Sequence, residues 1–281
     1  MRPVRAWILY LVAVFVGAAL VAPWVHAIAQ SLAQAVPAFR SVANAPFHRY
    51  VTRSMMLIAL GGLWPLFSVS GLFSWRATGL TPASPRRLLQ GFGWGFVSLA
   101  LVAAMGLLGQ GRSWNVERSG VEIVRHMLNA GLAAALVSPL EELLFRGGLF
   151  GVMRRASGWR TALLFSSLVY AGAHFLDRAR WDGPVTWWSG FAVLGRMCMG
   201  QTDLALLMPK FLTLTLAGTA LALAYQRTGT LWLSIGLHSG WIFWLKSYAF
   251  LTADGPASTS WFWGSGRLVD GWLAVAVMAC V

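Results

Sequence analysis

Charged residues are scarce in this chain. They make up 11% of its 281 residues, whereas 57% are hydrophobic. A soluble domain is usually about 25% charged. This deficit, with a mean hydropathy of +0.63, excludes an ordinary soluble domain and predicts a membrane protein. At roughly 20 residues per span, the length suits a bundle of six to eight helices.

Cysteine and acidic residues are also few. The two cysteines, Cys198 and Cys280, exclude a disulfide framework and a cysteine-rich metal site. Nine acidic residues stand against 22 basic ones, for a net charge of +13. The basic residues lie in short clusters between apolar runs, as they do in proteins anchored against phospholipid headgroups. With no nucleic-acid-binding motif present, the lipid bilayer is the expected partner and nucleic acid is not.

The apolar runs predict an all-α fold, a polytopic bundle of seven to eight transmembrane helices. The first run is longer than a usual signal-peptide core, which favours a retained span over a cleaved one. An aromatic run at 187–200 is too short for a span and is expected to be interfacial or re-entrant. The predicted spans are about 7–28, 55–73, 89–108, 121–154, 161–175, 204–225 and 231–251, and a short run at 268–281 would be the eighth.

Three segments are expected along the chain. They are an N-terminal span and loop (1–50), a core that carries the polar motifs (51–251), and a C-terminal loop with the last apolar run (252–281). Arginine placement modestly favours a cytoplasmic N-terminus. The 20 arginines against two lysines, together with compact loops, favour a bacterial inner membrane.

Two acidic residues stand inside apolar sequence. A carboxylate in a membrane helix costs roughly 2.5–3.5 kcal/mol, so Glu141 and Glu142 need a partner or a function. Glu142 and Arg146 are four positions apart with the acid first, the favourable order for an ion pair on a helix. This pairing predicts a structural role for Glu142. Glu141 has Phe145 at the same spacing and is the candidate for chemistry, unless it caps a helix broken at Pro139 or pairs with a distant arginine.

Two histidines are expected near the depth of Glu141. His174 follows Glu141 by 33 positions, with a polar turn at Ser157-Gly158 midway. In a helical hairpin each residue would lie about 24 Å from that turn, and so at equal depth. His238 lies about 12 Å beyond the turn at Thr230, and equal depth there requires the earlier turn to protrude further.

At these residues the chain resembles the CPBP family of intramembrane endopeptidases, which includes the CAAX prenyl endopeptidases. The family patterns are EExxxR, FxxxH and HxxxN, or a hydrophobic variant of the last, on separate helices, and the resemblance covers about residues 50–250. It implies an intramembrane endopeptidase acting on a membrane protein or peptide, with Glu141, His174 and His238 as catalytic residues. The matching residues here are Glu141, Glu142 and Arg146, then Tyr170 and His174, then His238 and Ile242.

Two positions depart from the family patterns. Tyr170 replaces phenylalanine and is expected to serve in packing. Ile242 replaces an asparagine that in the family belongs to the pocket stabilising the oxyanion, and isoleucine cannot donate a hydrogen bond. The Ser234 hydroxyl and the Trp241 indole N–H are the candidate replacements.

The resemblance implies a mechanism. Glu141 would be the general base, His174 would orient the water, His238 would stabilise the oxyanion, and Arg146 would hold Glu142. The same Glu141, His174 and His238 could instead bind zinc with water as the fourth ligand. Chemistry without a cofactor is preferred. Neither the substrate nor the oligomeric state can be read from the sequence.

Two other classes of function stay open. Ile242 favours a catalytically impaired member acting as a non-enzymatic immunity or interaction protein. Buried acids and histidines also occur along the ion paths of transporters. The lack of an inverted repeat argues against a transporter. A protease is the preferred hypothesis.

Overall fold

The computed structural model describes residues 2–72, 74–115, 117–174, 181–199, 204–257 and 260–281. Helices dominate this part of the chain, as predicted, and the all-α class is confirmed. The helices are α1 (Arg2–Ala35), α2 (Arg40–Ala43), α3 (Phe47–Val69), α4 (Trp75–Thr78), α5 (Pro85–Leu108), α6 (Gly120–Glu142), α7 (Gly151–Ser157), α8 (Trp159–Ala173), α9 (Ser189–Met199), α10 (Leu204–Thr228), α11 (Trp232–Leu251), α12 (Ser260–Trp263) and α13 (Trp272–Ala279), with a 3₁₀ turn η1 (Pro37–Phe39) and a π-helix η2 (Leu143–Phe150).

The chain forms two compact units. Unit 1 comprises Met1–Phe73 and Phe175–Thr202, and unit 2 comprises Ser74–His174 and Asp203–Val281. The residues of all three motifs belong to unit 2. The division into 1–50, 51–251 and 252–281 rests on sequence motifs alone and stays a prediction.

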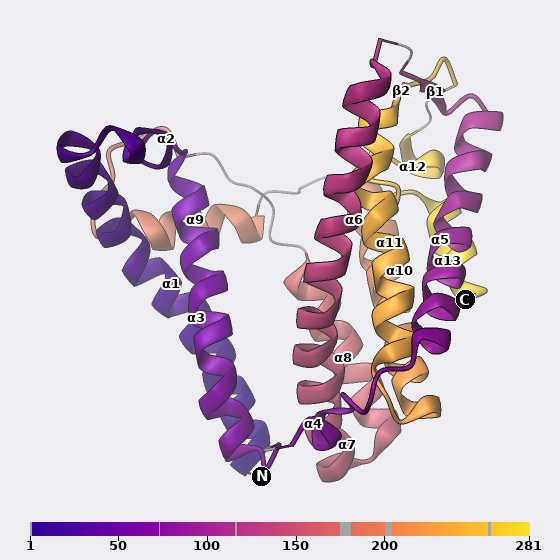
Figure 1. Ribbon diagram of the computed structural model, residues 1–281, viewed down its shortest axis with the longest axis horizontal. Coiled ribbons are helices and arrows are strands. Elements are labelled where there is room, and N and C mark those ends of the chain that lie inside the picture. Colours follow the sequence, from indigo (N-terminus) through magenta and orange to yellow (C-terminus); the bar gives the residue numbers. More distant parts are fainter. Residues whose placement is uncertain (1, 73, 116, 175–180, 200–203, 258–259) are drawn as a thin grey trace. The chain divides into compact units, whose positions relative to one another are not determined.

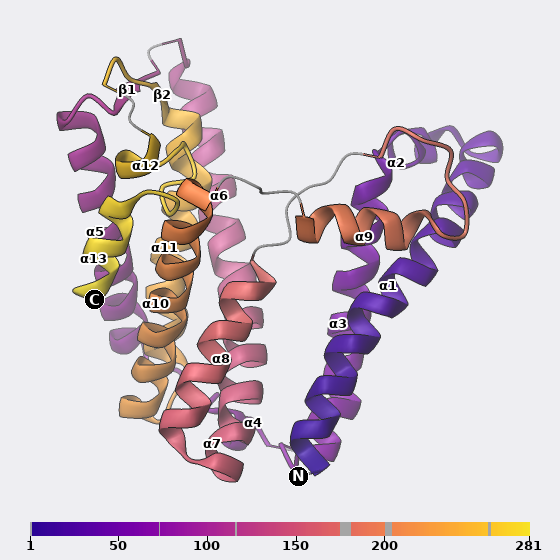
Figure 2. The same cartoon turned by 180° about the vertical axis from the view of Figure 1, so that it is seen from behind.

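In unit 1, α1 and α3 lie side by side, and α9 crosses α1 (Figure 2). Gly190 of α9 sits directly on the backbone carbonyl of Ala19 in α1, where any Cβ would overlap. The absence of a side chain therefore sets the close approach of these two helices. The core of unit 1 consists of Ala22, Ala29, Phe47, Tyr50, Val51, Val193 and Met197.

In unit 2, the long helices α5, α6, α10 and α11 are arranged with α11 packed against α5, α6 and α10 (Figure 1). The shorter α8 packs against α10 and η2. Helix α11 is therefore the element through which the other helices of this unit are connected, and it carries the third motif.

Four glycines determine how α5 and α11 meet. Gly91 and Gly95 of α5 lie against the backbone of α11, and Gly236 and Gly240 of α11 lie against the backbone of α5. A Cβ at any of the four would overlap backbone atoms of the other helix. Small residues four apart allow membrane helices to approach closely. His238 is two positions from each α11 glycine, about 200° around the helix, so it faces away from α5.

A small antiparallel sheet closes one end of unit 2. Strand β1 (Arg112–Trp114) pairs with β2 (Thr252–Asp254), with Ser113 opposite Ala253. Arg112 is buried, pairs with Asp254 and donates to the Thr252 hydroxyl and carbonyl. The sheet connects the start of α6 with the end of α11. These two helices carry the first and third motifs.

Five helices in the described part of the chain are long and apolar enough to cross a membrane: Arg5–Ala35, Phe47–Val69, Pro85–Leu108, Gly120–Ser157 and Leu207–Thr228. Several of the other predicted segments form shorter helices. Helix α8 has 15 residues, α9 has 11 and α13 has eight, against roughly 20 for a full span. The count of seven to eight spans stays a prediction. The predicted segment ends at 73, 175 and 200 lie outside the described residues.

Candidate active site

A change of helix type follows the two glutamates. Glu141 and Glu142 form the last turn of α6, and the chain continues without a break into the π-helix η2. Pro139 lies in the preceding turn, where it removes one backbone donor. Gly147 lets η2 lie against the Thr78 carbonyl of α4. π-turns within α-helices occur frequently at functional sites, and no sequence pattern predicted this one.

Glu142 and Arg146 form the predicted ion pair. Arg146 Nη1 lies 2.8 Å from Glu142 Oε1, with the two side chains 2% and 0% exposed. Arg146 Nη2 also donates to the Gly218 carbonyl of α10, at 3.3 Å. The pair thus links the first-motif helix to α10, as well as neutralising a buried carboxylate.

Glu142 has a second partner, which the sequence did not indicate. His238 Nδ1 lies 2.9 Å from Glu142 Oε1. A carboxylate paired with arginine only accepts hydrogen bonds, so Nδ1 carries the hydrogen, and Nε2 of a neutral ring is then an acceptor. Nε2 lies 3.2 Å from the Tyr170 hydroxyl, which donates to it in that tautomer. Glu142 therefore sets both the orientation and the tautomer of His238.

His174 is held by the backbone of its own helix. Its Nδ1 lies 2.8 Å from the Tyr170 carbonyl oxygen. A carbonyl only accepts, so Nδ1 donates, and in a neutral ring Nε2 then carries the lone pair. Nε2 lies 3.5 Å from Glu141 Oε2. The Nε2 edge of His174 thus faces the carboxylate of Glu141.

Glu141 lies between the two histidines. Its Oε2 is 3.5 Å from His174 Nε2 and 3.6 Å from His238 Nε2. Both distances exceed the usual 2.7–3.2 Å of a direct hydrogen bond, as in contacts bridged by water. Oε2 itself is buried and has no hydrogen-bond partner among the described residues. The Glu141 cluster consists of Glu141, Glu142, Arg146, Tyr170, His174 and His238. Glu141 and His174 are 28% and 31% exposed, so their side of the cluster is open, whereas the Glu142 side is closed.

The other predicted site residues occupy different surroundings. Ser234 donates to the Leu231 carbonyl at 3.0 Å, and Trp241 Nε1 donates to the Ser98 hydroxyl of α5 at 2.9 Å. Both groups thus donate their hydrogen bonds to residues outside the Glu141 cluster. Ile242 is buried and contributes no donor. Tyr170, expected only to pack, bonds through its hydroxyl to His238.

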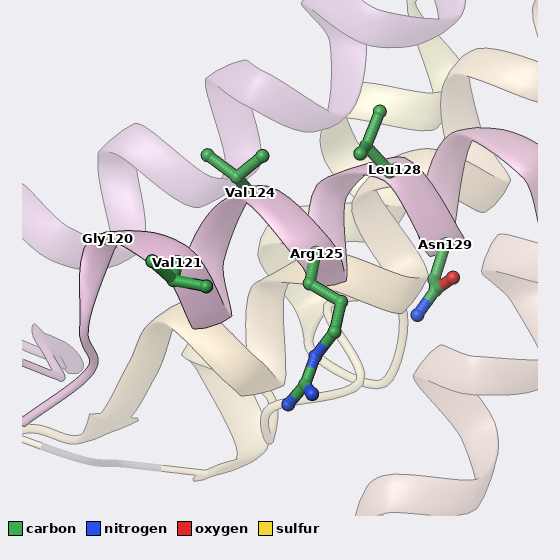
Figure 3. Close-up of a pocket in the computed structure, with 6 residues that line it drawn as sticks. All are labelled: Gly120, Val121, Val124, Arg125, Leu128 and Asn129. Atoms are coloured by element: carbon green, nitrogen blue, oxygen red, sulfur yellow. The ribbon is translucent and has the colours of Figure 1, made fainter.

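A separate hollow lies along the outer face of α6 (Figure 3). Its lining comprises Gly120, Val121, Val124, Arg125, Leu128 and Asn129. Val121, Val124 and Leu128 are strongly exposed, and Asn129 is about 18 Å along the helix from Glu141. This mixture of apolar and basic groups at the start of a spanning helix suits the membrane interface, and it is not part of the Glu141 cluster.

The residues do not fit a zinc site in this arrangement. In the described part of the chain, no group of three or more His, Cys, Asp or Glu side chains is placed to hold a metal ion. The Tyr170 hydroxyl oxygen lies 3.2 Å from His238 Nε2, on the side of the ring where a zinc ion would have to bind. No step below depends on a metal.

The comparisons with known proteins give one family match. Residues 123–244 match the family described as type II CAAX prenyl endopeptidase Rce1-like. Neither the curated proteins nor the solved structures contained a match to the chain. The matched segment includes all three motifs and every residue of the Glu141 cluster. The match over residues 123–244 therefore supports the resemblance of this segment to the family of CAAX prenyl endopeptidases.

Proposed function

We propose that this multi-pass membrane protein is an intramembrane endopeptidase that hydrolyses a peptide bond of a membrane-associated protein or peptide. The observation that carries the proposal is the convergence of two imidazole Nε2 atoms on Glu141 Oε2, within 3.6 Å, in a segment that matches a protease family. The three groups come from α6, the end of α8, and α11. A bacterial inner membrane and a cytoplasmic N-terminus belong to the same proposal.

The chemistry starts with a water held at the open side of the cluster. Its two hydrogens point to Glu141 Oε2 and His174 Nε2, both of which are acceptors. Glu141 takes one proton as the water oxygen attacks the peptide carbonyl carbon, and it returns that proton to the leaving amine. Negative charge develops on the carbonyl oxygen at the His238 side, where hydrogen-bond donors must stabilise it.

Glu142 and Arg146 act through His238. Arg146 neutralises the Glu142 carboxylate, and the same carboxylate accepts a hydrogen bond from Nδ1–H of His238. A histidine ring held in one orientation by a carboxylate is an arrangement common to many hydrolytic sites. Replacing either member of the pair would leave an unpaired charge beside the reacting groups.

The test compares wild-type protein with Glu141→Gln in reconstituted membranes. Glutamine keeps the size of the side chain and removes the base, so we expect cleavage to fall by about 10²–10⁴-fold. The readout is the set of new peptide termini, found by mass spectrometry after incubation with membranes of the expressing cells. Matched insertion and amount of the two proteins are the control.

Identical sets of new peptide termini from wild type and Glu141→Gln would contradict the protease proposal. The alternative would then be a non-enzymatic interaction protein on a protease scaffold. Buried Ile242, which contributes no donor, is the observation that favours it.

A further inference from the structure

A neutral His238 ring has no hydrogen with which to stabilise the oxyanion. His238 Nδ1–H is committed to Glu142, at 2.9 Å. The neutral ring has no second hydrogen, and its Nε2 accepts from another group. His238 in this state therefore has no hydrogen to offer a developing negative charge, although its Nε2 faces the side where that charge arises.

The hydrogen on this side of His238 belongs to Tyr170. The hydroxyl oxygen of Tyr170 lies 3.2 Å from His238 Nε2, and that nitrogen lies 3.6 Å from Glu141 Oε2. The phenol and the carboxylate that activates water thus contact the same ring nitrogen of His238. Phenylalanine would fill the same volume without the hydrogen.

The ring of Tyr170 is fixed on several sides. The Arg146 guanidinium lies over its face with Cζ 4.4 Å from the ring centroid. The Phe145 ring meets it edge-on at 5.2 Å, and the His174 ring lies 4.3 Å away. The side chain is only 3% exposed. Only the O–H bond is left to turn, so the ring and the phenol oxygen need no rearrangement when charge develops.

The residues first considered for this task are occupied elsewhere. Ser234 donates to a backbone carbonyl of its own helix, and Trp241 donates to Ser98 of α5. Ile242 has no donor. Among the side chains considered for the oxyanion, the Tyr170 hydroxyl alone lies beside His238 in the described structure.

We propose that Tyr170 is a further catalytic residue, the hydrogen-bond donor to the oxyanion. In the resting site its hydrogen points to His238 Nε2. When water attacks, the O–H turns to the carbonyl oxygen and donates a hydrogen bond to it, and it turns back when the amine leaves. No bond to hydrogen breaks on Tyr170. His238 positions the phenol oxygen, and this assignment rests on the endopeptidase function proposed above.

The experiment compares four full-length proteins in proteoliposomes: wild type, Glu141→Gln, Tyr170→Phe and Tyr225→Phe. Tyr225 is the matched control because it is also 3% exposed and lies in α10, outside the cluster. The probe is a peptide spanning the terminus that wild type produces and Glu141→Gln does not. We expect Tyr170→Phe to lower kcat about 10²–10³-fold, as loss of one oxyanion donor does, with KM little changed. Tyr225→Phe should match wild type.

The outcomes separate the two proposals. If Glu141→Gln abolishes cleavage while Tyr170→Phe matches wild type, the Tyr170 assignment is wrong and the protease function stands. If Glu141→Gln cleaves as well as wild type, the protease function is wrong and the assignment falls with it.

A second measurement covers a Tyr170→Phe protein that does not fold. Fluorotyrosine at position 170 keeps the ring and the hydroxyl but donates a stronger hydrogen bond. If the phenol hydrogen stabilises the oxyanion, kcat changes while KM stays the same. An unchanged kcat overturns the assignment.

Discussion

The two sides of the polar cluster differ in how tightly they are held. On the Glu142 side, Glu142, Arg146 and His238 are at most 5% exposed and joined by contacts of 2.8 and 2.9 Å. On the Glu141 side, Glu141 and His174 are about a third exposed, and the Glu141 contacts are 3.5 and 3.6 Å. Adjacent glutamates thus have opposite surroundings. The closed side supports orientation, and the open side has the room and the free acceptors that a reacting water requires.

The largest expected effect is the loss of stability caused by Glu142→Ala. This change leaves Arg146 as an unpaired buried charge and removes the acceptor for His238. Breaking a buried pair by removing one partner costs about 3–5 kcal/mol in the free energy of unfolding. Glu141→Ala should cost much less, because that side chain is part-exposed and has no direct ion pair within 3.2 Å. Unfolding of both variants in detergent measures the difference, and equal losses would remove the contrast between the two sides.

The second-largest expected effect is a difference in stability between the alanine variants of the two histidines. His238→Ala removes a hydrogen bond to a charged group, worth about 1.5–3 kcal/mol. His174→Ala removes a bond to a backbone carbonyl, worth about 0.5–1.5 kcal/mol. Both variants should lose cleavage, but only His238→Ala should unfold clearly earlier. A larger stability loss for His174→Ala would mean that the closed side has been wrongly identified.

Helix packing behind His238 offers a test from outside the cluster. Gly240→Ala would push α11 away from α5, and overpacking of this kind costs about 1–3 kcal/mol. Gly93→Ala is the control, since a Cβ at Gly93 of α5 has no atom within 4 Å. We expect Gly240→Ala to lower both stability and cleavage, and Gly93→Ala to leave both close to wild type. If Gly240→Ala behaves like Gly93→Ala, the glycine contact does not position His238.

The smallest expected effect is that of chelation. Because the His238 lone pair already accepts from Tyr170, we expect exhaustive treatment with a strong zinc chelator to leave the cleavage rate unchanged. The measurement is the rate before and after chelation, with zinc added back as the control. Loss of activity that zinc restores would favour the metal-dependent form of the site.

Some of the site could be predicted because it depends on short-range helix geometry. Four-residue spacing on one helix brings Glu142 to Arg146 regardless of the rest of the fold, and the structure has that pair. The motif order on apolar helices likewise indicated the family of residues 123–244. Other features gave no sequence signal. The π-helix after Glu142 has no composition that distinguishes it from α-helix, and the role of Tyr170 depends on which atom its hydroxyl meets.

By itself, the sequence determined that the chain is apolar and helical, that two acids stand in an apolar helix, and that Arg146 pairs with one of them. These are local properties of composition and of spacing along one helix. Only the tertiary structure decided that Glu142 also binds His238, 96 positions away, and that Tyr170 faces that same ring. It also decided that the Ser234 and Trp241 side chains donate their hydrogen bonds to groups outside the Glu141 cluster. The reason is rotational: how far each helix is turned about its axis is set by contacts such as those of Gly236 and Gly240 with α5, which no local pattern records.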